Sequence, residues 1–117
     1  MIEIQNEKGF IRISNNVFTN LVGEAATNCF GVKGMAMRSV SDGLVHLLKR
    51  ESMGKGVYLK YNEDSTVTID LHIIIDRGVN IQALASSIIS EVGYKIQMST
   101  GIKVESVNVF VDSVMTD

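Results

Sequence analysis

One long alternation of apolar and polar residues constrains this sequence more than any other feature. From Val67 to Ile75 every second residue is a branched apolar one, and a shorter alternation from Val57 to Tyr61 precedes it. Turn-forming residues at 62–65 separate the two runs, so the sequence predicts a β-hairpin with one buried face. The length and β-branched character of the second strand favour a place in the interior of a sheet.

Two other stretches have the spacing of apolar residues, three or four apart, that is typical of a helix packed on a core. The first runs from about Asn15 to Phe30, with Ser14 as its N-cap and Gly31 as the glycine that closes it. The second begins after Asn80, which can act as its N-cap, and ends at residues 100–101. Both helices need a sheet face to cover their apolar stripes.

Short alternations predict one strand at each end of the chain. Residues 9–13 place Ile11 and Ile13 on one face, and residues 107–112 place three valines on one face. We expect residues 113–117 to fray, as chain ends commonly do.

Segment 31–56 has the weakest pattern. The serine-aspartate pair at 41–42 is followed by leucines and then by Lys49 and Arg50, which is the order of cap and charge expected for a short helix. Gly54 and Gly56 would end this helix.

These elements follow one another in the order β-α-(α)-β-β-α-β, which indicates the α+β class. We expect a two-layer sandwich in which two main helices cover a mainly antiparallel sheet of about four strands. Residues 1–117 form a single domain in this interpretation, because no linker or second hydrophobic region is present. A ferredoxin-like topology has the same order if segment 31–56 is an insertion.

Composition excludes several classes of protein. The chain has 117 residues, a net charge of −2 and one cysteine, Cys29, which rules out an internal disulfide and a zinc site built on several thiolates. Cys29 lies on the apolar stripe of the first helix and is interpreted as a small buried residue. Acidic residues near the start argue against a signal peptide, and the most apolar run, 71–75, is too short to span a bilayer. We therefore expect a soluble, cytoplasmic protein.

Candidate catalytic residues are few. Asp70 and His72 lie two residues apart on one strand face and could form an acid-base or metal-binding pair, while His46 falls on the expected short helix. A metal site needs three or four ligands, and no further spacing of histidines or cysteines supplies them. We therefore predict no catalytic residue, no metal and no cofactor. A metal-assisted enzyme at Asp70 and His72 is the alternative.

The best interaction candidates lie between residues 31 and 37. Gly31 and Gly34 enclose Lys33 in a Gly-X-X-Gly turn, the arrangement with which KH domains clamp a nucleic-acid backbone between two helices. The net negative charge makes nucleic acid an unfavoured partner. A KH-like module that binds single-stranded RNA is therefore the alternative to a protein-binding function. Met35 and Met37 could form an adaptable protein-binding surface, and their alternation equally suits a short edge strand with buried sulfurs. If that edge is exposed, either interpretation predicts self-association or a protein partner.

A series of short motifs, in this order and spacing, resembles the alkaline-shock protein family, an envelope-stress domain found mainly in Gram-positive bacteria. The similarity extends from about residue 7 to residue 114, and the segments that carry it are 9–14, 31–35, 55–57, 68–73, 78–81, 100–104 and 107–111. The resemblance implies a non-enzymatic cytoplasmic protein of envelope stress and homeostasis that acts through protein contacts or oligomerisation. It also implies recruitment to the membrane through a membrane-anchored partner, without insertion of this chain.

Overall fold

A computed structural model describes residues 2–38 and 43–115, and in this part of the chain it contains two sheets, two α-helices and a 3-10 helix. The α+β class is confirmed. In chain order the elements are β1 (Ile2–Asn6), β2 (Gly9–Ile13), α1 (Asn15–Thr27), β3 (Val32–Arg38), β4 (Val45–Leu47), η1 (Arg50–Gly56), β5 (Val57–Tyr61), β6 (Val67–Ile75), α2 (Ile81–Thr100) and β7 (Val104–Val114).

Strand β6 is the centre of the five-stranded sheet. Along one edge it pairs with β7 in parallel, from Val67 to Ile75. Along its other edge it pairs antiparallel with β5 in its first half and with β3 at its end, and β3 in turn pairs with β4. The predicted hairpin and the interior position of β6 are therefore confirmed. The sheet is largely antiparallel, as expected, and the β6–β7 pair is the parallel exception.

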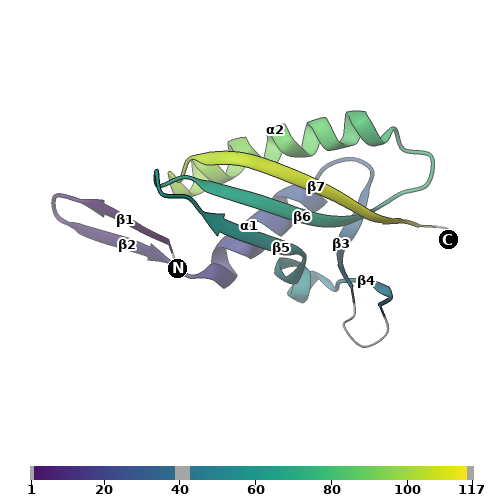
Figure 1. The fold of residues 1–117 in the computed structure, drawn as a ribbon, viewed down its shortest axis with the longest axis horizontal. Helices are drawn as coiled ribbons and strands as arrows, with labels where there is room; N and C mark the ends of the chain where they lie inside the picture. The colour runs from purple at the N-terminus through teal and green to yellow at the C-terminus, as the bar shows by residue number, and fades with distance from the viewer. Residues whose placement is uncertain (1, 39–42, 116–117) are drawn as a thin grey trace.

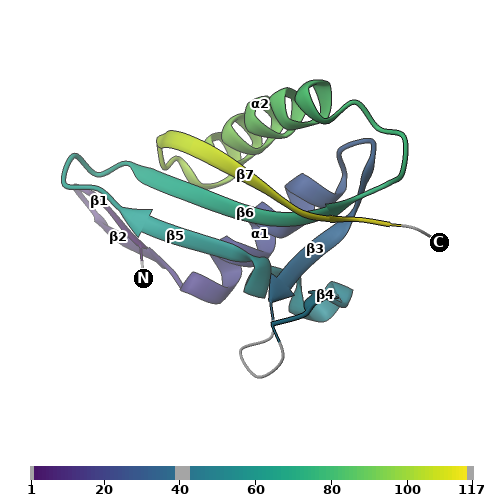
Figure 2. The same cartoon turned by 45° about the vertical axis from the view of Figure 1, so that its right-hand side comes forward.

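Helices α1 and α2 lie side by side against one face of this sheet (Figures 1 and 2). The alternate residues of β6 from Val67 to Ile75 point into the core that forms between the two layers. Each of them is at most 1% exposed. Both helices contribute to the same core through Phe18, Val22, Ala25, Ala26, Leu84, Ile88, Val92 and Ile96.

Helix boundaries follow from their caps. The Ser14 hydroxyl accepts from Val17 N at 3.2 Å, and the Asn80 side chain accepts from Ala83 N at 3.0 Å, so both predicted N-caps are confirmed. Gly101 ends α2 in the left-handed conformation. Helix α1 ends at Thr27 rather than Phe30, and Gly31, with φ +94°, instead turns the chain into β3.

Segment 31–56 differs most from our expectation. The predicted helix after residues 41–42 is wrong for the described part, because residues 45–47 form β4 and pair with residues 36–38. Residues 41 and 42 themselves lie outside the described residues. Leu48 N donates to Met35 O at 2.8 Å, which extends the contact between the two segments. A free sheet edge offers this segment backbone partners that outweigh the weak helix preference of a short, glycine-containing stretch.

The N-terminal hairpin is a second, separate sheet that extends from the body of the protein (Figure 1). Strand β1 was not predicted, and β2 pairs with β1 rather than joining the main sheet. The ferredoxin-like topology is therefore wrong, since it needs the strand before α1 in the same sheet as β6. The expected fraying is also wrong in part, because β7 continues to Val114 and Met115 N donates to Ile75 O at 2.8 Å. Residues 116–117 lie outside the described range.

Candidate functional site

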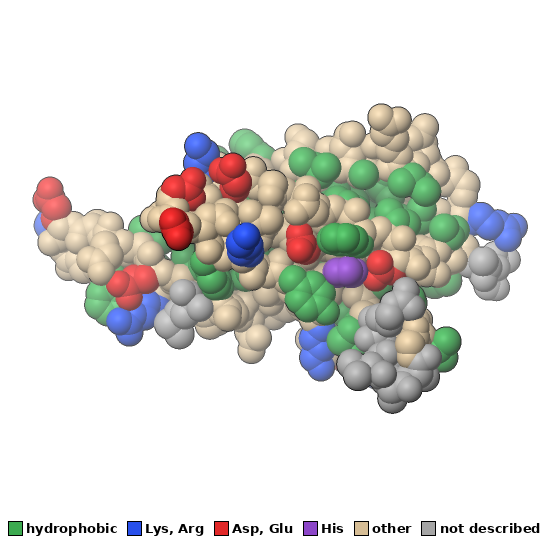
Figure 3. Space-filling model, in the orientation of Figure 1, with side chains coloured by type: hydrophobic (Ala, Val, Ile, Leu, Met, Phe, Trp, Pro, Cys, Tyr) green, Lys and Arg blue, Asp and Glu red, His purple; other side chains and the backbone are tan. Residues whose placement is uncertain are grey.

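The face of the main sheet opposite the helices, here called the open face, carries the polar half of the alternation. It gathers aromatic, histidine and acidic side chains near the middle of the sheet (Figure 3). Its residues come from β5, β6 and β7, and the register of these strands sets them in rows. The open face comprises Tyr58, Lys60, Thr68, Asp70, His72, Ser106, Asn108 and Phe110, with Glu105 and Asp112 at its margin.

An aromatic row crosses the open face from β5 to β7. The rings of His72 and Phe110 are stacked, with centroids 4.7 Å apart and an interplanar angle of 9°. Tyr58 meets His72 edge-on, with centroids 5.3 Å apart. Tyr58 is 52% exposed and Phe110 is 44% exposed, so the row presents its aromatic surface to the solvent.

Asp112 orients the central histidine of the row. His72 Nδ1 donates to Asp112 Oδ2 at 2.9 Å, because an ionised carboxylate can only accept. Asp112 reaches this position because the β6–β7 register shifts between residues 73 and 74, which leaves it as the extra residue of a bulge. The predicted pairing of Asp70 with His72 is not formed. Asp70 instead accepts from Asn108 Nδ2 at 2.9 Å.

The described residues contain no group of three or more histidine, cysteine, aspartate or glutamate side chains that could hold a metal. His46 lies on β4, in register with Met37 of β3. Cys29 is buried, and Sγ donates to Ala25 O at 3.6 Å. Burial raises the pKa of the Cys29 thiol, and nearby Glu91 raises it further against the opposing effect of Lys95. At neutral pH this favours the unreactive thiol.

The five predicted interaction residues lie in different environments. Gly31 precedes β3 and the other four belong to it, so the Gly-X-X-Gly segment connects a helix to a strand and not two helices as in a KH domain. Lys33 is exposed, Met37 is half-buried, and Gly34 is covered by Leu47 of β4. Met35 is buried in the core, where it fills space between the layers rather than facing a partner.

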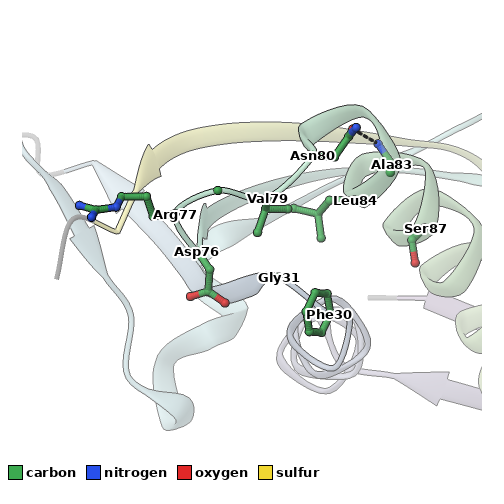
Figure 4. A pocket seen from close by; sticks show the side chains of 10 residues that line it. Phe30, Gly31, Asp76, Arg77, Val79, Asn80, Ala83, Leu84 and Ser87 are labelled. Atoms are coloured by element: carbon green, nitrogen blue, oxygen red, sulfur yellow. Dashed lines mark hydrogen bonds between the residues drawn. The ribbon is translucent and has the colours of Figure 1, made fainter.

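A cavity of about 540 Å³ lies beside Gly31, where α1 ends and α2 begins. Figure 4 shows the side chains of Val79 and Leu84 between the start of α2 and Gly31. Phe30 also lines this cavity and is 94% exposed, because the turn at Gly31 directs it away from the core. Sequence periodicity had assigned Phe30 to the helix.

Comparison with known proteins gives one family match, over residues 3–116, to the model of the alkaline-shock protein family, which is described as having a cell envelope-related function. The resemblance in the sequence motifs is therefore confirmed. No solved structure matches the chain.

The chain is also similar to several bacterial proteins over nearly its whole length. It is 35% identical to the uncharacterized protein YloU of Bacillus subtilis (strain 168), over 97% of this chain and 94% of that protein. It is 32% identical to the uncharacterized protein Spy1614 of Streptococcus pyogenes serotype M6, over 97% and 93% of the two chains. Within residues 2–38 and 43–115, neither helix combines the length and the hydropathy that crossing a membrane requires.

Proposed function

The chain belongs to the alkaline-shock protein family, whose function is cell envelope-related, and from this premise we propose that it is a non-enzymatic module that binds another protein in envelope homeostasis. In this proposal the protein is cytoplasmic. It reaches the membrane through an anchored partner.

The observation that carries this proposal is the exposed aromatic row on the open face. Aromatic side chains are enriched at the centres of protein interfaces, where they bury a large area at a low cost in conformational entropy. Tyr58 and Phe110 have this character, and they stand on paired strands of the main sheet. The hydrogen bond from His72 to Asp112 holds the middle ring in place, so the row is ordered before a partner binds.

Acidic side chains beside the row favour protein over nucleic acid as the partner. Asp70 and Asp112 lie next to the stacked rings, and both would repel a phosphate backbone. Sheet faces that bind RNA combine such rings with basic residues. Among the residues that define the open face, Lys60 is the one lysine or arginine.

Site-specific photo-crosslinking in the native host tests the proposal. A photoreactive phenylalanine analogue at position 58 or 110 should trap a distinct protein, whereas the same analogue at Tyr94, an exposed position on α2, should not. A strain carrying Phe110→Ser should show the envelope-stress sensitivity of a deletion strain, and Tyr94→Ser should not. Identical crosslinks at all three positions would contradict the proposal, as would a turnover activity of the pure protein that His72→Ala abolishes.

A further inference from the structure

Strand β7 leaves one edge of the main sheet open. It has 11 residues and pairs with β6 along one side, and no strand within residues 2–38 and 43–115 pairs with its other side. The register with β6 shifts near residues 104–106 and again near 111–113, so a regular stretch from Ser106 to Val111 lies between two bulges. A stretch of this length matches an ordinary strand and offers unpaired backbone groups to another chain.

An apolar strip runs beside this edge. Ser87 lines a cavity with Phe30 and Gly31, and Lys95 and Met98 line a hollow with Ala25 of α1 and with Asn28, which identifies the side of α2 that faces α1. Ile81 and Ile89 lie away from that side and are 49% and 45% exposed. Green side chains gather between the first half of α2 and β7 in Figure 3. The helix-facing residues Val109 and Val111 of β7 are only half-buried, so they continue the strip to the strand edge.

The other side of the same edge is acidic. Residues 104–114 include two acids, Glu105 and Asp112, and no lysine or arginine. Asp112 lies on the open face against His72, and Glu105 lines a surface hollow with Lys60 and Thr68. The two carboxylates therefore stand at the two ends of the regular stretch, on the open-face side.

We infer that the outer edge of β7 binds an extended segment of a partner protein as an added strand, with apolar side chains alternating with basic ones. The backbone of Ser106–Val111 supplies the hydrogen bonds. Because side chains alternate across a strand, one set packs on the strip of Ile81, Ile89, Val109 and Val111. The other set points to the open face, where lysine or arginine meets Glu105 and Asp112. This inference rests on the proposed function and specifies the partner's chemistry.

A second copy of the chain is the less favourable occupant. Antiparallel pairing of β7 with itself brings together two segments that each carry two acids and no base. Like charges across a strand pair are destabilising, whereas opposite charges are stabilising. Charge complementarity therefore selects a basic partner strand over self-pairing.

Titration of the isotope-labelled protein with short synthetic peptides tests the inference by NMR. A capped peptide that alternates valine and lysine should shift the amides of residues 106–111 and slow their hydrogen exchange. A valine-glutamate peptide should not bind, because its acids meet Glu105 and Asp112. A peptide with its lysines and valines in separate blocks should bind at least about tenfold more weakly, since one face cannot then be apolar.

Matched variants on α2 locate the site. Ile89→Lys should weaken binding of the valine-lysine peptide by about tenfold or more, while Met98→Lys, at a 69% exposed position on the α1 side, should leave it unchanged. Glu105→Lys should reverse the preference between the valine-lysine and valine-glutamate peptides.

Several results would overturn the inference. These are the absence of shifts in residues 106–111 at millimolar peptide, equal binding of both charged peptides, or binding that Ile89→Lys leaves unchanged. Shifts of the same residues with protein concentration, without peptide, would assign the edge to self-pairing instead. The proposed function fails separately, if crosslinking at positions 58 and 110 traps no partner while the peptide still binds.

Discussion

The two faces of β6 differ in burial and in the contacts that their side chains make, although both come from one alternating run of residues. On the inner face Leu71 and its alternate neighbours are completely covered by α1 and α2. On the outer face Asp70 and His72 are half-buried and make polar or aromatic contacts with β7. The comparison indicates that the inner face determines stability, and that the outer face, which we propose binds the partner, can change with little effect on folding.

The largest expected effect on stability comes from a substitution that creates a cavity at the inner face. Leu71→Ala should lower the free energy of unfolding by about 2–5 kcal/mol, because it removes buried methyl groups and leaves a cavity. Asp70→Ala, one residue away on the outer face, should cost less than about 1 kcal/mol. Urea denaturation of both variants measures the difference, and equal costs would contradict the division between the faces.

A glycine at the margin of the inner face should have the next largest effect. Gly31→Ala should cost about 1–3 kcal/mol, because φ is +94° and an added Cβ would lie 3.1 Å from Val79. Gly78 has φ +83° but nothing within 4 Å of an added Cβ, so Gly78→Ala reports backbone strain alone. Thermal denaturation should rank Gly31→Ala as the more damaging change, and the reverse order would show that packing at Gly31 is loose.

Removing a ring from the outer face should have a smaller effect on folding. Phe110→Ala should cost about 0.5–1.5 kcal/mol through loss of the stack on His72. Tyr94→Ala removes an exposed ring from α2 and should be close to neutral in the same urea titration. A cost for Phe110→Ala as large as that for Leu71→Ala would mean that the outer face is part of the core.

The smallest effect is expected in the turn that joins β5 to β6. Hydrogen bonds from the Thr66 hydroxyl and amide lower the pKa of Asp64 from its usual 3.8. The carboxylate therefore stabilises the fold above pH 3.8, and its contribution is lost as pH falls through the lowered pKa. Asp64→Ala should be slightly less stable than the parent at pH 7 and equal to it in strong acid. If the difference in stability between the parent and Asp64→Ala stays constant in urea titrations from pH 7 to pH 2, ionisation of the Asp64 carboxylate does not cause it.

Local signals in the sequence predicted the elements that depend on local interactions. The hairpin of β5 and β6 and the N-caps of both helices were predicted because alternation and capping residues act within a few positions. Strand β4 and the parallel pairing of β7 were missed, because both depend on a partner edge far along the chain. Strand β1 was also missed, although it is as long as β2, because its pairing with β2 is what identifies it as a strand.

The candidate site was only partly visible in the sequence. Alternation placed His72 and Phe110 on the outer sides of their strands, but only the register shows that they stack. Asp112 could not be predicted as the partner of His72, because a bulge brings it there. Alternation left open whether Met35 faces a partner or lies buried on a strand, and the structure buries it because β3 joins the main sheet.

The parallel pairing of β6 with β7 has a consequence for synthesis on the ribosome. All of α2 lies between these two strands in the sequence, so β6 leaves the ribosome long before β7, the strand that pairs with its second edge. During that interval a strongly apolar strand has one unpaired edge, and unpaired strand edges favour aggregation of nascent chains. Ribosome pausing within the α2 codons would prolong this exposure, and chaperones that shield apolar strands would have their main opportunity there.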